Sequence, residues 1–312
     1  MANKYITKPA KISIAICTRE RPIMLTNLLK SFQSIEILQN VDVQIDIIEN
    51  HTETNLAKLI CNLAPSLPFK INHHWEPKIG IPIARNHALR VARESNATHI
   101  IFIDDDELVA PQWLKELWNT YLQYDENTII QGAVASLINT TKNKHLHQLF
   151  QRGHKKTGDR MQLCATNNVI VQLEVLKKHN IYFDESRPLA GGTDSKLFRK
   201  AAQRGIPMIF CADAIVYEDI PEERITISWL SKRHFRTGLT YGEHYRATGA
   251  GLMFPAARSW DLFRYSLRAL TYIIKLNKYK FQKRWLKICR TCGRILGFFH
   301  YRIDSYKKTD GQ

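Results

Sequence analysis

The sequence predicts an α/β protein whose mostly parallel central sheet is flanked by helices and followed by a basic helical extension. Three observations predict this class. Apolar, β-branched segments alternate with helical patterns through residues 11–217, as in parallel sheets. One such segment, residues 99–107, stops at four consecutive acids. From residue 226 onward the pattern is almost entirely helical and rich in lysine and arginine.

The first half of the chain alternates strands with helices. We expect strands at 11–17, 43–48 and 69–74, and a fourth, acid-tipped strand from residue 99. The helices expected between them are at 23–37, 56–63 and 83–94. Ligands of such sheets gather beyond the carboxyl ends of the strands. We therefore expect Thr18, Glu49 and Asp104 at the same edge.

The second half is less regular. A helical pattern follows Pro111, and apolar segments predict strands at 129–137, 166–171, 207–211 and 214–217, with helices at 173–179 and 194–204. Residues 141–161 are polar and basic, which is typical of a mobile loop over a site.

The chain is expected to divide into an α/β domain, residues 1–225, and a helical region, residues 226–312. Helices are predicted at 228–246, 258–276 and 279–299. Residues 258–308 hold fourteen lysines and arginines against two acids, which gives +12 of the total formal charge of +16. Basic amphipathic helices are typical of an anionic membrane surface. The alternative is that they pack on the main domain or in an oligomer.

Composition excludes several other classes. A hydrophobic fraction of 44% and a charged fraction of 24% are those of a globular protein. The basic residues are concentrated in the extension, so a nucleic-acid partner is not expected. Six scattered cysteines form no disulfide framework, and Cys289 with Cys292 lacks a second ligand pair for zinc. The N-terminus lacks an apolar signal segment, so the expected location is cytoplasmic. The basic helices make that location peripheral, on the cytoplasmic face of the inner membrane.

The acids after residue 103 predict a cation site. Carboxylates packed closely together repel one another, and hard oxygen ligands favour Mg²⁺ or Mn²⁺. Because side chains alternate along a strand, Asp104 and Asp106 are expected to face one way and Asp105 the other. Asp104 and Asp106 could then bind the same ion. The alternative is a solvated loop that begins the helix after Pro111.

Six segments, in order, resemble the family 2 glycosyltransferases of the GT-A fold, which has a Rossmann-like sheet. Within that family the likeness is to the bacterial exopolysaccharide type, exemplified by succinoglycan-biosynthesis glucosyltransferases. The matching segments are residues 11–22, residues 80–88 with their Ala-Arg-Asn, the DXD segment at 102–107, Thr166 to Asn168, residues 191–205 around Asp194, and residues 217–238 with Tyr217 to Arg224, Trp229, Arg233 and Arg236.

The resemblance implies an inverting, metal-dependent transfer of a sugar from a nucleotide diphosphate sugar, with uridine favoured over guanosine, to a hydroxyl of a glycan or lipid-linked acceptor in cell-surface polysaccharide biosynthesis. Mn²⁺ or Mg²⁺ would be held by Asp106 and Asp104, and Asp194 would be the catalytic base. The residues implied at the donor are Thr18, Arg19, Arg21, Glu49, Arg85, Asn86, Asp104, Asp105 and Asn168.

Two positions depart from the family pattern near the base. Thr193 stands where the family usually has Glu, and Lys196 replaces another frequent acid. From position alone, Asp194 is more typical of an acid in the first turn of a helix, with Thr193 as the N-cap, where the helix dipole stabilises it. The resemblance to the family is what favours the base.

Two other functions fit parts of the sequence. A sugar-phosphate nucleotidyltransferase shares the fold neighbourhood, but residues 18–22 contain no glycine with which to build its phosphate loop. A non-enzymatic basic module that binds membrane or nucleic acid explains the extension and leaves the aspartates without a role.

Overall fold

The computed structural model describes residues 10–151, 153–301 and 303. Eight strands form one sheet in the order β3-β2-β1-β4-β7-β6-β8-β5. They are β1 (Ala10–Thr18), β2 (Val41–Glu49), β3 (Lys70–Trp75), β4 (His99–Asp104), β5 (Glu107–Val109), β6 (Ile129–Leu137), β7 (Asn168–Gln172) and β8 (Met208–Asp219). The pairs among β1 to β4 are parallel, whereas β7 runs antiparallel to β4 and β6. The predicted mostly parallel sheet is confirmed.

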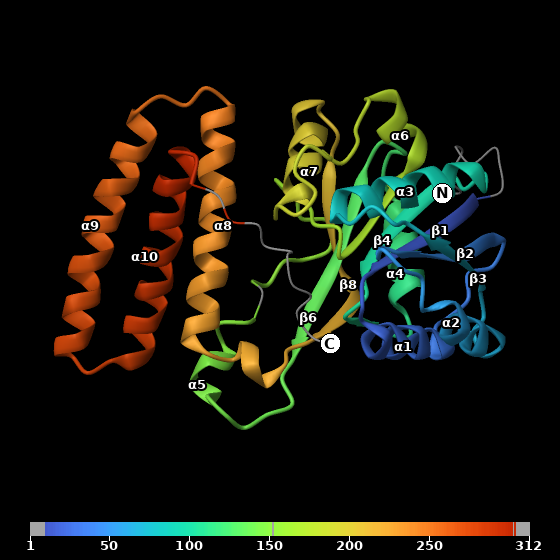
Figure 1. Cartoon of the computed structure of the whole chain (residues 1–312), viewed down its shortest axis with the longest axis horizontal. Helices are drawn as coiled ribbons and strands as arrows, with labels where there is room; N and C mark the ends of the chain where they lie inside the picture. The colour runs from blue at the N-terminus through green and yellow to red at the C-terminus, as the bar shows by residue number, and fades with distance from the viewer. Residues whose placement is uncertain (1–9, 152, 302, 304–312) are drawn as a thin grey trace.

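Helices cover both faces of the sheet (Figure 1). Apolar side chains of α1 (Pro22–Ser31), α2 (Ala57–Leu63) and α4 (Trp113–Tyr121) join one buried cluster with alternate side chains of β1 and β2. The opposite cluster contains α3 (Ile81–Glu94), α6 (Leu173–Lys178) and α7 (Thr193–Gln203). Because successive strand side chains point to opposite faces, the continuous apolar strands supply both clusters.

Several elements differ from the prediction. The helix expected at 23–37 ends at Ser31 and passes into a short 3₁₀ turn, η1 (Phe32–Ser34). The two strands expected at 207–211 and 214–217 are one strand, β8, since a register shift opposite Gly132 absorbs the irregular residues between them. Short β5 was not predicted.

The chain continues through η3 (Glu222–Arg224) into three long helices, α8 (Ile227–Ala247), α9 (Met253–Ile274) and α10 (Lys278–Phe298), which lie side by side at one end of the molecule (Figure 1). Two pairs of glycines let α8 and α10 approach backbone to backbone. A Cβ on Gly242 would lie 2.1 Å from the Arg294 carbonyl oxygen, and one on Gly293 would lie 2.2 Å from that of Phe235. Within the described ranges, no helix is both long and apolar enough to span a bilayer.

The 141–161 segment contains one short helix, α5 (Lys144–His147). Its Leu146 and Phe150 join Ile225, Leu230 and Leu286 in a small buried cluster. The segment thereby connects the sheet to the helices α8 and α10.

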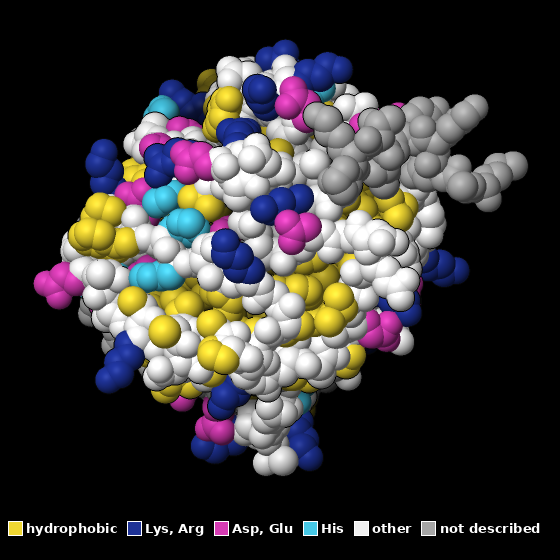
Figure 2. Space-filling model, turned by 90° about the vertical axis from the view of Figure 1, so that its right-hand side faces the viewer, with side chains coloured by type: hydrophobic (Ala, Val, Ile, Leu, Met, Phe, Trp, Pro, Cys, Tyr) yellow, Lys and Arg dark blue, Asp and Glu magenta, His cyan; other side chains and the backbone are white. Residues whose placement is uncertain are grey.

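The free edge of the sheet at β3 carries His73 and His74, and Figure 2 shows histidines grouped among charged side chains on that side of the molecule. His73 Nε2 lies 2.8 Å from Glu49, and His74 Nε2 lies 3.1 Å from Asp46. Both carboxylates belong to the neighbouring strand β2, so these contacts fasten the edge strand to the sheet.

Candidate active site

The carboxyl ends of β1, β2 and β4 meet at one edge, as predicted. Thr18 pairs with Glu49 and Cys17 pairs with Asp104. A cavity of about 460 Å³ opens there, between the sheet edge, the segment before α7 and one face of α8. Its polar and charged lining residues include Thr18, Arg19, Arg21, Asn50, Arg85, Asp104, Asp105, Asp106, Ser195, Glu218, Arg224, Arg233, Arg236, Thr237, Thr240 and Tyr241.

Asp105 is the anchored member of the acid run. Only 5% of its side chain is exposed, and it accepts hydrogen bonds from Thr18 Oγ1 at 2.7 Å and from Arg21 Nη1 at 2.8 Å. Burial raises the pKa of Asp105 despite the opposing charge of Arg21. This carboxylate therefore links the end of β1 to the end of β4.

Asp104 and Asp106 present their carboxylates to the cavity. The Asp104 side chain is 44% exposed, and its Oδ1 lies 3.5 Å from Arg85 Nη2. Asp106 Oδ2 lies 3.7 Å from Arg21 and 3.9 Å from Arg224. Desolvation by the surrounding protein, opposed by Arg85 and reinforced by Asp106, Asp105 and Asp194, raises the pKa of Asp104 to about 7. A cation bound here would favour the ionised form.

The carboxylate oxygens of Asp104 and Asp106 are ligands that fit Mn²⁺ or Mg²⁺. Such ions bind through one or two carboxylates while water and substrate phosphates complete the shell. Asp104 and Asp106 supply two hard carboxylates in one cavity. Among the described residues, no group of three histidine, cysteine or acidic side chains is arranged to hold a metal by protein ligands alone. Asp104 and Asp106 are the residues that would hold the ion together with a phosphate-bearing substrate.

Asp194 lies in the first turn of α7, beside the cavity. Gly192 and Ser195, on either side of it, line the cavity, and the charge of Asp194 is among those that raise the pKa of Asp104. The Asp194 carboxylate accepts a hydrogen bond from the Ser195 amide at 2.7 Å. The cap of α7 is Gly192, in a left-handed conformation, rather than Thr193. Thr193 Oγ1 instead accepts a hydrogen bond from Arg85 at 3.2 Å.

Glu49 lies beneath the site and outside the cavity lining. Its carboxylate accepts hydrogen bonds from Thr54 Oγ1 at 2.7 Å and from the Asn55 amide at 2.8 Å, and it contacts His73. Burial opposes ionisation, yet these hydrogen bonds hold the pKa of Glu49 below its usual value. The contacts order the loop after β2, while its nucleotide contact stays a prediction.

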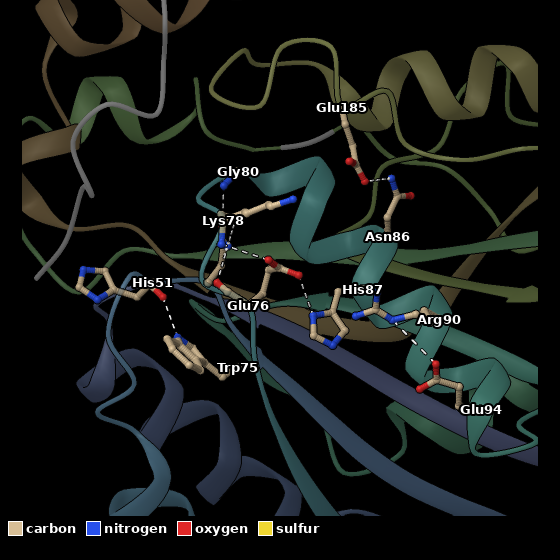
Figure 3. Close-up of polar contacts among 11 residues, drawn as sticks. His51, Trp75, Glu76, Lys78, Gly80, Asn86, His87, Arg90, Glu94 and Glu185 are labelled. Atoms are coloured by element: carbon tan, nitrogen blue, oxygen red, sulfur yellow. Dashed lines mark hydrogen bonds and ion pairs between the residues drawn. The ribbon is translucent and has the colours of Figure 1, made fainter.

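The loop before α3 is fastened from both sides (Figure 3). Glu76 contacts His87 at 2.9 Å, and Trp75 Nε1 donates to the His51 carbonyl oxygen at 2.8 Å. The Gly80 amide donates to Asn50 Oδ1 at 2.8 Å, and Asn50 lines the cavity. These bonds fix the cavity wall formed by Ile79 to Ile81.

Two asparagines singled out by sequence also face away from the cavity. Asn86 turns toward Glu185 (Figure 3) and exchanges hydrogen bonds with the Phe183 backbone at 2.9 and 3.0 Å. Asn168 is fully buried, accepts from Trp113 Nε1 and donates to two backbone carbonyls. Both side chains join segments distant in sequence. Their contacts with the nucleotide-sugar donor stay predictions.

The helical region supplies one wall of the cavity. Arg224, Trp229, Arg233 and Arg236, from η3 and α8, line it opposite the sheet edge. The likeness of residues 217–238 to an exopolysaccharide signature was the available signal, but sequence alone gave these four residues no role in the site.

With the geometry established, comparison with known proteins identifies the family. The sequence model described as "Glycosyl transferase family 2" matches residues 13–179, more than half of the chain. The chain belongs to glycosyl transferase family 2. It is therefore a glycosyltransferase, and the resemblance inferred from the sequence is confirmed.

A curated relative, the succinoglycan biosynthesis protein ExoM of Rhizobium meliloti (strain 1021), is 26% identical over 291 residues, covering 84% of this chain and 90% of that protein. This family 2 enzyme is thus related to an exopolysaccharide biosynthesis protein.

Solved structures share the GT-A fold. S. aureus TarS 1-349 in complex with UDP superposes with a TM-score of 0.53 at 14% identity, covering 97% of this chain and 95% of that one. GalNAc-T7 with UDP, GalNAc and Mn²⁺ gives 0.55 at 14% identity, covering 78% of this chain and 52% of that one. Another structure of S. aureus TarS gives 0.51 at 16% identity, covering 73% of this chain and 39% of that one.

Proposed function

We propose that this enzyme transfers a sugar from UDP-sugar to a hydroxyl of a glycan or lipid-linked acceptor in cell-surface polysaccharide biosynthesis, with inversion at the transferred carbon. One observation carries the proposal. A single cavity is lined by Asp104 and Asp106 at the sheet edge and by Gly192 and Ser195, which flank Asp194 at the start of α7. A leaving-group site and a base thus adjoin the same space.

The uridine nucleotide is supported by the compared structures, which contain UDP or UDP-GlcNAc in TarS and UDP with Mn²⁺ in GalNAc-T7. A bound divalent ion would stabilise the negative charge that develops on the diphosphate as the glycosidic bond breaks. Arg21 and Arg224, each within 4 Å of Asp106, orient that carboxylate and add positive charge at the same place.

Inversion follows from a single displacement. The acceptor oxygen attacks the anomeric carbon from the side opposite the diphosphate, the bond to the diphosphate oxygen breaks, and the acceptor proton passes to the Asp194 carboxylate. Arg85 donates to Thr193 and contacts Asp104, so it connects the base-bearing helix to the sheet edge. The Arg85 guanidinium thereby holds the start of α7, with Asp194, at a fixed position relative to Asp104.

The cell-surface role is supported by the relative's printed name, a succinoglycan biosynthesis protein. In the two-part organisation proposed here, residues 226–312 dock residues 1–225 on the cytoplasmic face of the inner membrane. A nucleotidyltransferase is disfavoured because the family assignment supplies a different activity.

An apolar stripe on α9 supports the membrane contact. Trp260, Phe263 and Ile274 are 61%, 52% and 81% exposed, and Leu267 and Leu270 lie between them at helical spacing. Arg264 and Arg268 are exposed on the same helix, and exposed Lys275 follows its last residue. The one acid of the helix, Asp261, is paired with Arg258. Two copies of this cationic face would repel each other, whereas anionic lipid complements it.

Cosedimentation with vesicles tests the membrane contact. The full chain should bind phosphatidylglycerol vesicles more strongly than phosphatidylcholine vesicles, and Trp260→Ser with Phe263→Ser should reduce that binding, whereas exposed Ile23→Ser on α1 should not. If the variant that carries Trp260→Ser and Phe263→Ser bound the vesicles as strongly as the parent chain, the membrane contact would be removed from the proposal.

The sugar donor is tested by ligand-induced stabilisation, because a ligand that binds only the folded state raises the melting temperature. UDP-sugars and GDP-sugars are titrated with and without Mn²⁺. We expect Mn²⁺-dependent stabilisation by UDP-sugars. Stabilisation by GDP-sugars alone would reject the uridine nucleotide, and stabilisation by neither would reject the nucleotide-sugar donor.

A further inference from the structure

The first turn of α7, which carries Asp194, lies ahead of the apolar contacts that anchor this helix. The α7 side chains in the buried cluster are Leu197, Phe198 and Ala201, and all of them follow the first turn. A general base has to lie within hydrogen-bond reach of the hydroxyl that it deprotonates. The position of the first turn therefore depends on contacts from outside α7.

The C-terminal half of α8 supplies such contacts. Gly192, the left-handed residue that caps α7, lies against Thr240, because a Cβ on Gly192 would be 2.4 Å from the Thr240 methyl group. The next residue of α8, Tyr241, has the Arg199 guanidinium carbon 5.1 Å from the centre of its ring, and that of Arg294 at 5.4 Å. One short stretch of α8 thus touches α7 at its cap and again about two turns later.

An ion pair fastens the loop before α7, residues 184–192, to the same part of α8. Arg187 Nη1 lies 2.8 and 3.1 Å from the two carboxylate oxygens of Glu243. Because Glu243 follows Thr240 by three residues, both side chains lie on one side of α8. A hollow of about 20 Å³ lies between this loop and α8, compared with about 460 Å³ for the cavity. The loop and α8 are therefore closely packed.

The two residues near Asp194 that depart from the family pattern also make contacts that fix α7. Lys196 pairs with Asp184 of the loop at 3.2 Å. Thr193 accepts a hydrogen bond from Arg85 of α3 at 3.2 Å. The loop and the first turn of α7 are thus joined to each other, so a contact that holds the loop against α8 also holds the first turn.

We propose that Thr240, Tyr241 and Glu243 of α8 are positioning residues that hold the first turn of α7, and with it Asp194, in place for sugar transfer. This inference rests on the proposed function, in which Asp194 is the base, and it gives the helical region a role besides membrane contact. A displacement of about 1 Å can slow an enzyme by roughly a hundredfold, whereas a partly exposed ion pair contributes little to folding. Loss of the Arg187–Glu243 pair should therefore affect the reaction more than the fold.

The test breaks this pair in the full chain with Glu243→Gln and, separately, with Arg187→Gln. Three quantities are measured: amide hydrogen exchange of residues 190–197, UDP affinity in the presence of Mn²⁺, and release of UDP from the nucleotide sugar found by the stabilisation screen, with water as the acceptor. We expect each variant to exchange about fivefold faster in the first turn of α7. UDP release should slow by roughly tenfold or more, while UDP affinity and the KM of the nucleotide sugar stay within about twofold.

Three further variants separate positioning from a general loss of structure. The double variant Arg187→Gln with Glu243→Gln should be no slower than either single variant, because all three lack the same pair. Glu243→Asp keeps the charge and should retain part of the rate. Asp261→Asn breaks the Arg258–Asp261 pair on α9, whose side chains are 31% and 23% exposed, close to the 23% and 27% of Arg187 and Glu243. This control should leave exchange in α7 and UDP release unchanged.

Both changes are required of Glu243→Gln. An unchanged exchange rate in α7, an unchanged rate of UDP release, or strictly additive effects in the double variant would overturn the positioning role. Slower release with weakened UDP affinity would assign Glu243 to the donor site and also overturn it. If the parent chain bound no UDP, or if Asp194→Asn released UDP as fast as the parent, the proposed function would fail. Hydrogen exchange would then still decide whether α8 holds the first turn of α7.

Discussion

Arg21 donates a hydrogen bond to Asp105 at 2.8 Å, and the same Nη1 atom lies 3.7 Å from Asp106. One guanidinium thus connects the segment after β1 to two members of the acid run after β4. Because Asp105 is also bonded to Thr18, the carboxylate that is least exposed fixes the backbone from which Asp104 and Asp106 face the cavity.

This pairing predicts a large penalty for removing one partner. Arg21→Gln leaves the Asp105 carboxylate buried without its cation and should lower the free energy of unfolding by roughly 3 kcal/mol. Adding Asp105→Asn removes the buried charge and should restore part of the loss. Urea unfolding of the parent, both single variants and the double variant gives the coupling energy, and strictly additive effects would contradict the pairing.

The metal assignment predicts that Asp106→Asn weakens Mn²⁺-dependent UDP binding by roughly a hundredfold, since a ligand carboxylate is lost. Asp42→Asn, on exposed Asp42 at the start of β2, is the matched control for the loss of one acid. Calorimetric titration of UDP at fixed Mn²⁺ measures both. Unchanged affinity in Asp106→Asn would remove Asp106 from the metal site.

The close approach of α8 and α10 predicts that Gly242→Ala destabilises the protein by about 1–3 kcal/mol, because the added methyl group meets the Arg294 carbonyl oxygen and forces the helices apart. Gly251→Ala is the control, since a Cβ there meets nothing within 4 Å. Chemical unfolding compares the two. Equal stability of both variants would contradict the close packing of these helices.

His99 predicts an acid-sensitive stability. Burial between Trp118 and Tyr121 lowers the pKa of His99 from 6.5 to about 4. The unfolded chain then binds a proton more readily than the folded one, so the contribution is present above pH 6.5 and is lost as the pH falls toward 4. Over that interval it amounts to about 3 kcal/mol.

Replacing His99 by Phe should therefore flatten the decline of unfolding free energy between pH 7 and pH 4, whereas exposed His154→Phe should leave the decline as it is. Urea unfolding at several pH values makes the comparison. The same slope in His99→Phe and the parent chain would show that His99 is not a source of the acid sensitivity.

The sheet and the acid run were predictable because their signals are local. Strand periodicity and the abrupt stop at Asp104 depend on neighbours in sequence, and parallel strands bring such ends to one edge by topology. The position of Thr18 beside Glu49, at the ends of β1 and β2, agrees with the same rule. The basic helices were also evident from spacing.

The rest depends on contacts between distant segments. Nothing local indicates that Asn168 binds the Trp113 indole, or that Asn55 and Thr54 surround the Glu49 carboxylate. The α8 wall needed the three-dimensional arrangement, because Arg236 is remote in sequence from the acids across the cavity. The spacing of residues 228–246 predicts a helix against the core, but nothing local indicates that its arginines line a site.

The most direct test of the proposed reaction is a single-turnover transfer assay of Asp194→Asn, with the donor found by the stabilisation screen and the anomeric configuration of the product read by NMR. The parent enzyme should give the inverted product. Asp194→Asn should bind UDP and Mn²⁺ with nearly parental affinity and transfer the sugar ~10²–10⁴-fold more slowly. Near-parental transfer by Asp194→Asn, or a product with retained configuration, would contradict the account.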